Sequence, residues 1–191
     1  MSLSGYKEKR IGMVCRLTAG KHVLESIKAM DLIHKKYPDW KFEIIGSGVL
    51  QNECETLIGN LNAKDYIDLH GWVEHSGLHY VTRKWRYLLF PTDTEGMPNA
   101  LLELMGWGIP GIASSVGGII DIIQDGSNGL IITDCSINEI YNGLYRAILI
   151  PENQYADMAQ NAYETIADKF SLEAAKKDEI ETLSVRKDQK V

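Results

Sequence analysis

Two cations five residues apart, Arg16 and Lys21, follow the first apolar run of the sequence. A guanidinium and an ammonium at this spacing, across a turn, can converge on one diphosphate. Lys21 also precedes a segment of helical pattern, and the unpaired N–H groups at the start of a helix favour anions. The spacing alone leaves open a second interpretation, in which both cations are solvated at the end of a strand.

A glycine-rich turn, Gly46-Ser47-Gly48, follows the second apolar run and would let a ligand approach the backbone closely. It does not match the dinucleotide fingerprint G-x-G-x-x-G, because Gln51 stands at the third glycine position. No acidic residue follows at the distance expected for a ribose partner in that motif. A dinucleotide-dependent oxidoreductase is therefore disfavoured, and a plain tight turn remains the alternative.

The stretch from Phe90 to Glu103 holds the groups best suited to bind sugars. Glu95 lies in a predicted loop and Glu103 on a helix that Pro98 opens, so both carboxylates can face one crevice. A carboxylate accepts two hydrogen bonds from hydroxyl groups, and the backbone of residues 96–99 supplies N–H donors beside it. In the alternative, Glu95 only complements the helix dipole and Glu103 is solvated. The apolar neighbours of Glu103 indicate, however, that its charge needs a partner.

Two metal-binding interpretations have weaker support. Asp93 and Glu95 are two carboxylates two residues apart, a pattern that holds divalent ions but is also common in loops. His75 and His79 have the i, i+4 spacing of zinc ligands, yet no third ligand is evident beyond His70. We therefore expect no metal site and no metal cofactor.

The elements that must position these groups alternate regularly along the chain. Short apolar runs predict β-strands, and the segments of helical periodicity between them predict helices. The predicted strands span residues 11–15, 42–45, 66–69, 87–90, 111–114 and 130–133. The predicted helices span residues 23 to about 38, 50–61, 78–85, 138–149 and 152–169, with a last helix beyond residue 171. Two further helices are predicted at one end only: one begins at residue 98, and a separate short one ends at residue 124. The candidate groups follow strands, and open parallel sheets bind ligands beyond the carboxyl ends of their strands.

Strands that read as unbroken apolar runs are buried on both faces, and a helix between each pair indicates parallel pairing. The fold class predicted is therefore α/β, a Rossmann-like parallel sheet of about six strands flanked by helices. The length of 191 residues fits one domain. We expect residues 1–9 to be a leader or linker remnant, residues 10–183 the domain, and residues 184–191 a solvated tail.

Composition excludes several classes of protein. The net charge of −6 argues against a nucleic-acid binder. No apolar run is long enough to span a bilayer, and the chain does not open on a secretory signal. The three cysteines have neither disulfide nor metal spacing, which is typical of a reducing compartment, so we expect a cytoplasmic protein.

Seven motifs, in this order, resemble those of the C-terminal domain of glycosyltransferase family 4 (group 1), retaining enzymes of the two-lobed GT-B fold. The resemblance covers about residues 10–183. Each motif is weak alone, and seven in register are specific. They are Arg16-Leu17 with Lys21, residues 44–48, residues 70–73, residues 90–103 with its two glutamates, residues 108–110, Gly117-Gly118 and residues 125–129.

The resemblance implies the donor-binding lobe of an enzyme that transfers a sugar from a nucleotide sugar, such as a UDP- or GDP-sugar, to an acceptor hydroxyl. It implies that Arg16 and Lys21 bind the diphosphate without metal, and that Glu95 contacts the donor sugar near its reacting carbon. Glu103 would hold the ribose hydroxyls. The other donor contacts that it implies are Gly46, Gly48, Trp72 and Val73 around the base, and Gly96, Met97 and Asn99 at sugar hydroxyls.

The sequence departs from the family pattern at a few positions. Cys15 and His22 replace glycines that usually flank the Arg–Lys segment, and Gly111-Ile112 stands where two valines are common. The changed glycines are the only support for an alternative, a non-catalytic nucleotide-binding or interaction module of the same fold.

A second lobe is also expected from the resemblance. Family members carry an N-terminal lobe that binds the acceptor, and this chain begins almost at the first strand of the C-terminal lobe. We expect that lobe to be missing, the chain alone to transfer no sugar, and the whole enzyme to associate peripherally with the inner face of the membrane.

Overall fold

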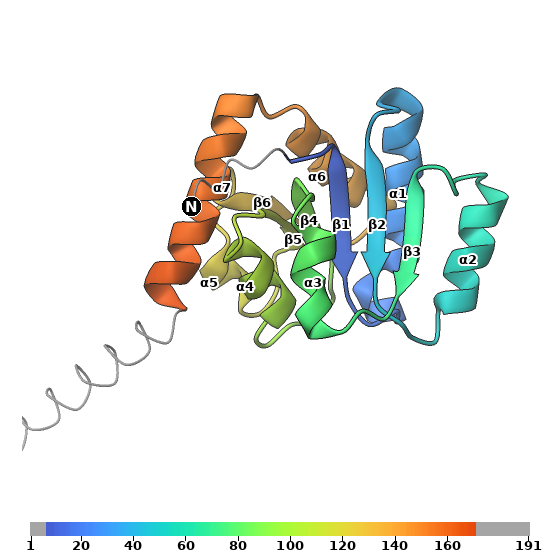
Figure 1. Ribbon diagram of the computed structural model, residues 1–191, viewed down its shortest axis with the longest axis horizontal. Coiled ribbons are helices and arrows are strands. Elements are labelled where there is room, and N and C mark those ends of the chain that lie inside the picture. The colour runs from blue at the N-terminus through green and yellow to red at the C-terminus, as the bar shows by residue number, and fades with distance from the viewer. Residues whose placement is uncertain (1–6, 171–191) are drawn as a thin grey trace, which may run out of the picture.

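A computed structural model describes residues 7–170 and places six strands in one sheet (Figure 1). All pairings are parallel, in the order β3-β2-β1-β4-β5-β6, as the unbroken apolar runs predicted. The strands are β1 (Arg10–Val14), β2 (Lys41–Ile45), β3 (Ile67–Gly71), β4 (Tyr87–Phe90), β5 (Gly111–Ser114) and β6 (Gly129–Ile132).

Seven α-helices and a 3₁₀ turn (Ala19–Lys21) connect and follow the strands in this part of the chain. The helices are α1 (Val23–Lys36), α2 (Gln51–Asn60), α3 (His75–Thr82), α4 (Asn99–Met105), α5 (Ile119–Ile122), α6 (Ile137–Ile148) and α7 (Glu152–Lys169). None of the helices described combines the length and the apolar character needed to cross a membrane.

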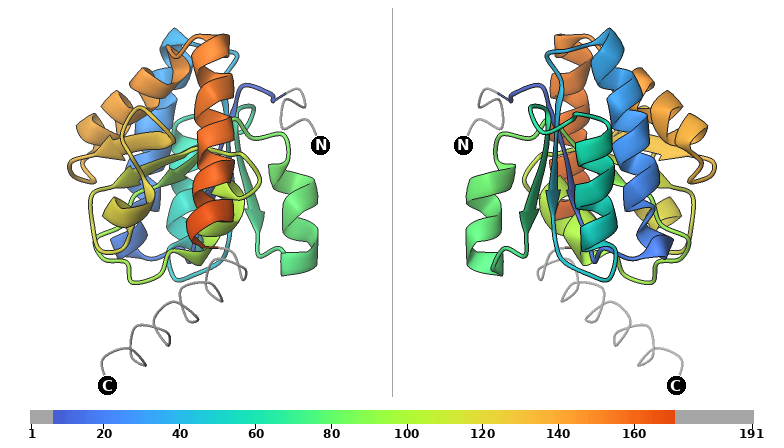
Figure 2. Two further views of the ribbon diagram at one scale, coloured as in Figure 1. Left: turned by 90° about the vertical axis from the view of Figure 1, so that its left-hand side faces the viewer. Right: turned by 90° about the vertical axis from the view of Figure 1, so that its right-hand side faces the viewer.

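Helices cover both faces of the sheet (Figure 2). On one face, α1, α2 and α6 pack against the strands in one apolar cluster, and on the other face α3, α4 and α5 form a second cluster. The long helix α7 packs against α4 and β6. Because side chains alternate along a strand, every strand except β3 contributes to both clusters: Ile44 of β2 faces the first cluster, and Ile45 faces the second.

The order of the strands creates a switch point between β1 and β4. From β1 the chain builds outward through β2 to β3, then returns to the other side of β1 and builds outward again from β4 to β6. From this switch point the chain after β1 leads to α1 on one face of the sheet, and the chain after β4 leads to α4 on the other face. In open α/β sheets such a switch point is the place where ligands bind.

Most predicted boundaries are shifted by one or two residues, and for two elements the structure shows the physical reason for the difference. The helix predicted at residues 78–85 is α3 (His75–Thr82), because the apolar Trp85 lies outside the helix, fully buried over Gly12 of β1. A Cβ on Gly12 would come within 1.9 Å of the Trp85 ring, so only glycine fits beneath the indole. Strand β3 also runs two residues further than predicted, to Gly71, because Gly71 pairs with Ile45.

Some predictions fall outside the residues that the structure describes. These are the first six residues of the predicted leader, the helix expected beyond residue 171, and the predicted tail at residues 184–191.

Candidate functional site

A cleft of about 560 Å³ opens at the carboxyl ends of β1, β2 and β3, between these strand ends and the start of α4. Figure 1 shows this edge of the sheet at the arrowheads of the strands. Five of the residues predicted to bind the donor or its phosphates line this one cleft, which brings together loops far apart in the sequence. They are Arg16, Gly46, Trp72, Val73 and Glu103.

The glycines of the second loop hold it against the first. Gly46 has a φ of +141°, and a Cβ there would lie 1.8 Å from the carbonyl oxygen of Cys15. At Gly48, a Cβ would lie 2.4 Å from the carbonyl oxygen of Leu17. The Leu17 N–H donates to the Ser47 carbonyl at 3.0 Å. Both glycines are thus needed for contact with the backbone that carries Arg16, and Gly46 also lines the cleft.

Lys21 is fixed at the switch point by groups from the loop after β4. Its ammonium donates to the Glu95 carboxylate at 2.7 Å and to the Thr92 hydroxyl at 2.9 Å, and lies 5.4 Å from the centre of the Phe90 ring. The Lys21 and Glu95 side chains are only 25% and 18% exposed, so the pair is partly shielded from water. Of Arg16, Lys21 and Glu95, the three residues that the family resemblance implies for catalysis, the last two are therefore in direct contact, although neither is among the residues that line the cleft.

The loop that carries Glu95 is held by Ser114, to which no sequence pattern assigned a role, and by Gly117 of the Gly117-Gly118 motif. The Ser114 hydroxyl at the end of β5 accepts from the Thr92 N–H at 3.0 Å and donates to the Thr92 carbonyl at 2.7 Å. Gly117, with a φ of +50°, packs so closely that a Cβ would lie 1.8 Å from the Glu95 carbonyl oxygen. Polar residues at the end of a buried strand were the available signal for Thr92 and Ser114.

Glu103 does have the partner that its apolar surroundings required. Its Oε1 atom lies 2.6 Å from Nε2 of His75, the first residue of α3, and the pair lies on the wall of the cleft. The His75 side chain is 82% exposed and can swing away, whereas Glu103 is only 24% exposed. The carboxylate is therefore held in the cleft by a partner that a ligand hydroxyl can replace.

The other predicted donor contacts lie on the surrounding loops. Trp72 lines the cleft with 71% of its surface exposed, and Met97, in the loop before α4, is 60% exposed. Gly96 lies in the same loop and Asn99 begins α4. Gly96, Met97 and Asn99 are not among the residues that line the cleft, so their contacts with a donor stay predictions.

Cys15 lines the same cleft, one residue before Arg16. Burial raises the pKa of its thiol to about 12, against the smaller opposing effect of the Lys21 charge. A thiol with this pKa is protonated at neutral pH and is a poor nucleophile. Cys15 therefore contributes bulk to the cleft rather than covalent chemistry.

The metal interpretations of the sequence find different partners in the structure. His75 contacts Glu103, whereas the His79 ring packs edge-on against Trp107 at 4.8 Å between ring centres, so the two histidines do not converge. Glu95 is engaged by Lys21, and Asp93 points to His22 at 2.7 Å.

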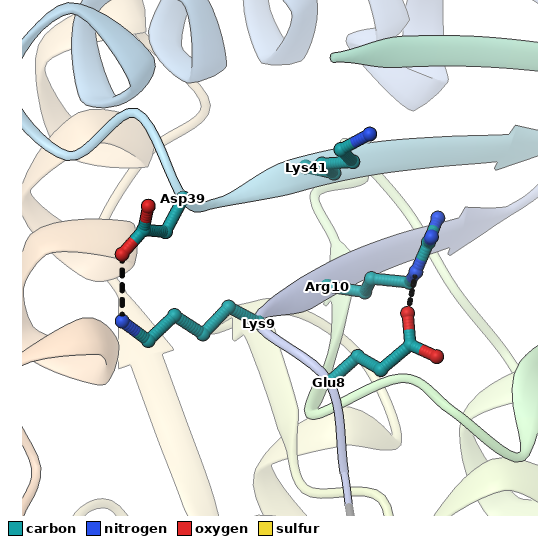
Figure 3. A pocket seen from close by; sticks show the side chains of 5 residues that line it. All are labelled: Glu8, Lys9, Arg10, Asp39 and Lys41. Carbon is teal, nitrogen blue, oxygen red and sulfur yellow. Dashed lines mark hydrogen bonds and ion pairs between the residues drawn. The ribbon is translucent and has the colours of Figure 1, made fainter.

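A second hollow lies at the opposite edge of the sheet, beside the amino ends of β1 and β2 (Figure 3). Its charged side chains are paired with one another: Lys9 with Asp39 at 3.0 Å, and Arg10 with Glu8 at 2.5 Å. Lys41 completes the lining. Because these opposite charges largely neutralise one another far from the strand ends that bind ligands, the carboxyl edge is the better candidate site.

Comparison with known proteins identifies the family. A family model for glycosyl transferases group 1 matches residues 2–165. The alpha-D-kanosaminyltransferase of Streptomyces kanamyceticus is 28% identical over 162 residues, which are 85% of this chain and 42% of that enzyme. The pneumococcal O-GlcNAc transferase GtfA, solved in complex with UDP and GlcNAc, is 29% identical with a TM-score of 0.79, over 96% of this chain and 37% of that one.

A third comparison indicates which part of such an enzyme the fold corresponds to. The C-terminal domain of a glycosyl transferase group 1 family protein (LpcC) from Francisella tularensis is 25% identical with a TM-score of 0.78. That match covers 87% of this chain and 89% of the solved domain, whereas the chain spans less than half the length of the kanosaminyltransferase and of GtfA. The chain therefore belongs to the group 1 glycosyltransferases and has the fold of their C-terminal domain.

Proposed function

We propose that this chain is the donor-binding lobe of a retaining glycosyltransferase, which transfers a sugar from a nucleotide-diphospho-sugar to an acceptor hydroxyl. One observation carries the proposal. Arg16, Gly46, Trp72, Val73 and Glu103 come from three loops and one helix and line a single cleft at the carboxyl edge, next to the Lys21–Glu95 pair. This edge is where an α/β sheet binds nucleotides.

The diphosphate would lie between Arg16 and Lys21. Both follow β1, and Lys21 is held by Thr92 and Glu95 with its ammonium at the switch point. Two fixed cations would neutralise the charge that develops on the nucleoside diphosphate as it leaves, so we propose that no metal ion is needed. The ammonium costs little reorganisation at that moment, because its position is set before the donor binds.

The two glutamates would act on different parts of the donor. Glu103 would accept hydrogen bonds from the ribose hydroxyls, with His75 moving aside. Glu95 would contact the donor sugar near its reacting carbon, and residues 96–99 would add backbone donors. The acceptor oxygen would attack on the face from which the nucleotide departs, so the bond to the β-phosphate breaks, the bond to the acceptor forms, and the configuration is retained.

A relative supports one choice of donor base. GtfA, at 29% identity, was solved with UDP and GlcNAc, which supports a UDP-sugar as the donor here. The acceptor would be bound by a second lobe facing the carboxyl edge, where Val49, Trp72, Met97 and Ile120 expose apolar surface. On this proposal the chain alone binds donor and transfers nothing.

Calorimetry of the chain with UDP, GDP and ADP, each with and without a chelator, tests this proposal. We expect micromolar to millimolar binding of at least one nucleotide, unchanged by the chelator, and a loss of about tenfold or more on Arg16→Ala, Lys21→Ala or Glu103→Ala. Lys64→Ala, which removes an exposed lysine from the turn before β3, at the amino end of that strand, is the matched control. Binding of none of the three nucleotides, or binding that needs a metal ion, contradicts the proposed site.

A non-catalytic module of the same fold is the second candidate, and a specific feature favours it. His22 has a φ of +48°, a conformation that suits the glycine usual at this position, and Cys15 adds a buried side chain next to Arg16. The same calorimetry distinguishes the two: unchanged nucleotide affinity in Lys21→Ala and Glu103→Ala supports this module.

A further inference from the structure

Three potential metal ligands from three loops meet beside the proposed donor site. His22 follows the 3₁₀ turn after β1, Asp93 lies in the loop after β4, and Cys135 lies in the loop after β6. His22 Nε2 is 2.7 Å from Asp93 Oδ1, and one ligand atom from each of the three residues lies within 4.8 Å of the other two. We propose that these three side chains form a binding site for a divalent cation of the zinc class.

The chemistry of the donors selects the class of metal. An imidazole nitrogen, a thiolate sulfur and a carboxylate oxygen together suit Zn²⁺ and Co²⁺, whereas Mg²⁺ and Ca²⁺ prefer oxygen ligands throughout. Three protein ligands leave one tetrahedral position for water. The site differs from a diphosphate-bound magnesium ion in this respect, and it is independent of the proposed transfer mechanism, which uses no metal.

The geometry requires only small adjustments. Ligand atoms around a tetrahedral zinc ion lie roughly 3.3–3.6 Å apart, as the metal–ligand bond lengths dictate. The His22–Asp93 hydrogen bond would open by well under 1 Å, and the sulfur would close by about 1 Å at most. Asp93 is 62% exposed and can make that movement, whereas the His22 side chain is only 20% exposed.

The contact on the other side of the His22 ring favours ligation by this residue. Its other ring nitrogen, Nδ1, faces the Glu25 carboxylate at 3.8 Å. A carboxylate on that side favours the proton on Nδ1 and leaves Nε2 free for a metal, as is usual for histidine ligands. The histidine therefore presents the correct nitrogen to the centre of the cluster.

The three loops are already joined by other hydrogen bonds. The Asp93 N–H donates to the Gly20 carbonyl at 3.1 Å, and the Cys135 thiol donates to the Thr92 carbonyl at 3.7 Å. Ser114 anchors Thr92 from the end of β5. The ligands are thus held by backbone that does not need to fold around the ion, which is the condition for a preorganised site.

The local charge also favours a cation. Asp93 brings a negative charge to the cluster, and Asp134 is the chain neighbour of Cys135. A bound cation would displace the thiol proton to solvent, after which thiolate and carboxylate balance its two positive charges.

Cobalt titration of the reduced chain, without nucleotide, tests the proposal. We expect one equivalent of Co²⁺ to bind with a sulfur-to-cobalt charge-transfer band in the near ultraviolet, and Zn²⁺ to abolish the band by displacement. His22→Gly and Cys135→Ala should each lose the band and weaken binding by at least about tenfold. Zn²⁺ should also raise the Tm of the natural chain but not of Cys135→Ala, because only a folded site binds it.

Cys15→Ala and Cys54→Ala are the matched controls for the loss of a thiol. His70→Gln is the control for a second group of potential ligands, Glu43, Asp68 and His70, in which Arg10 already pairs with Glu43. All three should keep the band. Any of three outcomes would overturn the site. The natural chain gives no band, the band survives Cys135→Ala in a variant that circular dichroism shows to be folded, or the band is lost in Cys15→Ala.

Discussion

Lys21 shows how a single residue can be prepared for an anion that is not yet bound. Its ammonium is paired with Glu95 at 2.7 Å, so part of its charge is already compensated. Within our proposal, a diphosphate must compete with that carboxylate for the Lys21 ammonium. It binds Arg16 without such competition. The pair therefore places the cation accurately while lowering its attraction for phosphate.

Glu95→Gln should for this reason bind UDP more tightly than the natural chain. The amide leaves the Lys21 charge uncompensated, and loss of a partly exposed ion pair of about 1 kcal/mol corresponds to a gain of about fivefold. Calorimetry at low salt measures the change. UDP-sugar should gain less, because Glu95 is proposed to contact the sugar.

Glu25→Gln is the control for this prediction, because Glu25 is an acid of the same region that faces His22 and not Lys21. It should leave UDP affinity unchanged. Weaker UDP binding by Glu95→Gln would mean that the carboxylate positions Lys21 more than it competes for it.

Two threonines, Thr82 (buried) and Thr165 (half-buried), allow a paired test of hydroxyls with different surroundings. Within residues 7–170 the Thr82 hydroxyl is buried without a hydrogen-bond partner, so Thr82→Val should stabilise the chain by about 1 kcal/mol. Thr165 donates to the Asn161 carbonyl at 2.7 Å and accepts from Asn128 at 2.9 Å. Thr165→Val should therefore destabilise it by about 1–2 kcal/mol. Urea denaturation measures both, and a loss of stability in Thr82→Val refutes the first.

At the residue scale, the sequence predicted which side chains gather at one site more accurately than it predicted the contacts between them. Glu95 and Glu103 were expected to face one crevice, but only Glu103 lines the cleft, together with Arg16. The Lys21–Glu95 contact was not predicted, since each charge was assigned to a ligand. Ser114 was missed because a hydroxyl at the end of an apolar run disturbs neither its length nor its period.

At the scale of the elements, helix α6 packs closely against the sheet at a glycine, Gly143. A Cβ on Gly143 would lie 2.5 Å from Ile132 and 3.1 Å from Ile112, both of which are strand residues. Gly143→Ala should gain about 1 kcal/mol of helix propensity but cost about 1–3 kcal/mol in overpacking, for a net loss of stability. Thermal and urea unfolding of this variant measure the balance.

Gly59→Ala in α2 is the matched control, because nothing lies within 4 Å of a Cβ there. Without a steric cost it should stabilise the chain by about 0.5–1 kcal/mol. Equal effects of the two substitutions would show that α6 can shift away from β5 and β6 at little cost.

The predicted elements were most accurate where hydrophobicity alone defines them. Strands β4 and β5 have the predicted bounds, since each is a short apolar run between polar or proline residues. The prediction of α3 was displaced by three residues because Trp85 was counted in the helix, although it packs over Gly12. A contact with a residue more than seventy positions away leaves no trace in local periodicity.

At the scale of the whole molecule, the strand order explains why the donor site can be complete within this chain. The switch point lies between β1 and β4, near the middle of the sheet, and every loop proposed to bind donor lies on its carboxyl edge. The strand order itself was not predicted from sequence, since apolar runs indicate burial but not neighbours. The acceptor site is a different matter, because the relatives extend well beyond the length of this chain.

The buried tyrosines make the stability of the whole domain sensitive to alkaline pH. Burial raises the pKa of Tyr87 to about 12 and also raises the pKa of Tyr155, whereas both titrate near 10 in the unfolded chain. The folded state therefore holds these protons longer, and stability that is complete below pH 10 falls as the pH rises through the folded pKa. Each tyrosine costs about 1.4 kcal/mol per pH unit in that window. Urea denaturation at pH 8, 10 and 11 should show this fall, and Tyr87→Phe should make it shallower. The same slope in both proteins would mean that Tyr87 does not contribute, and that Tyr66, Tyr155 or the thiols of Cys15 and Cys54, whose pKa values burial also raises, account for the fall.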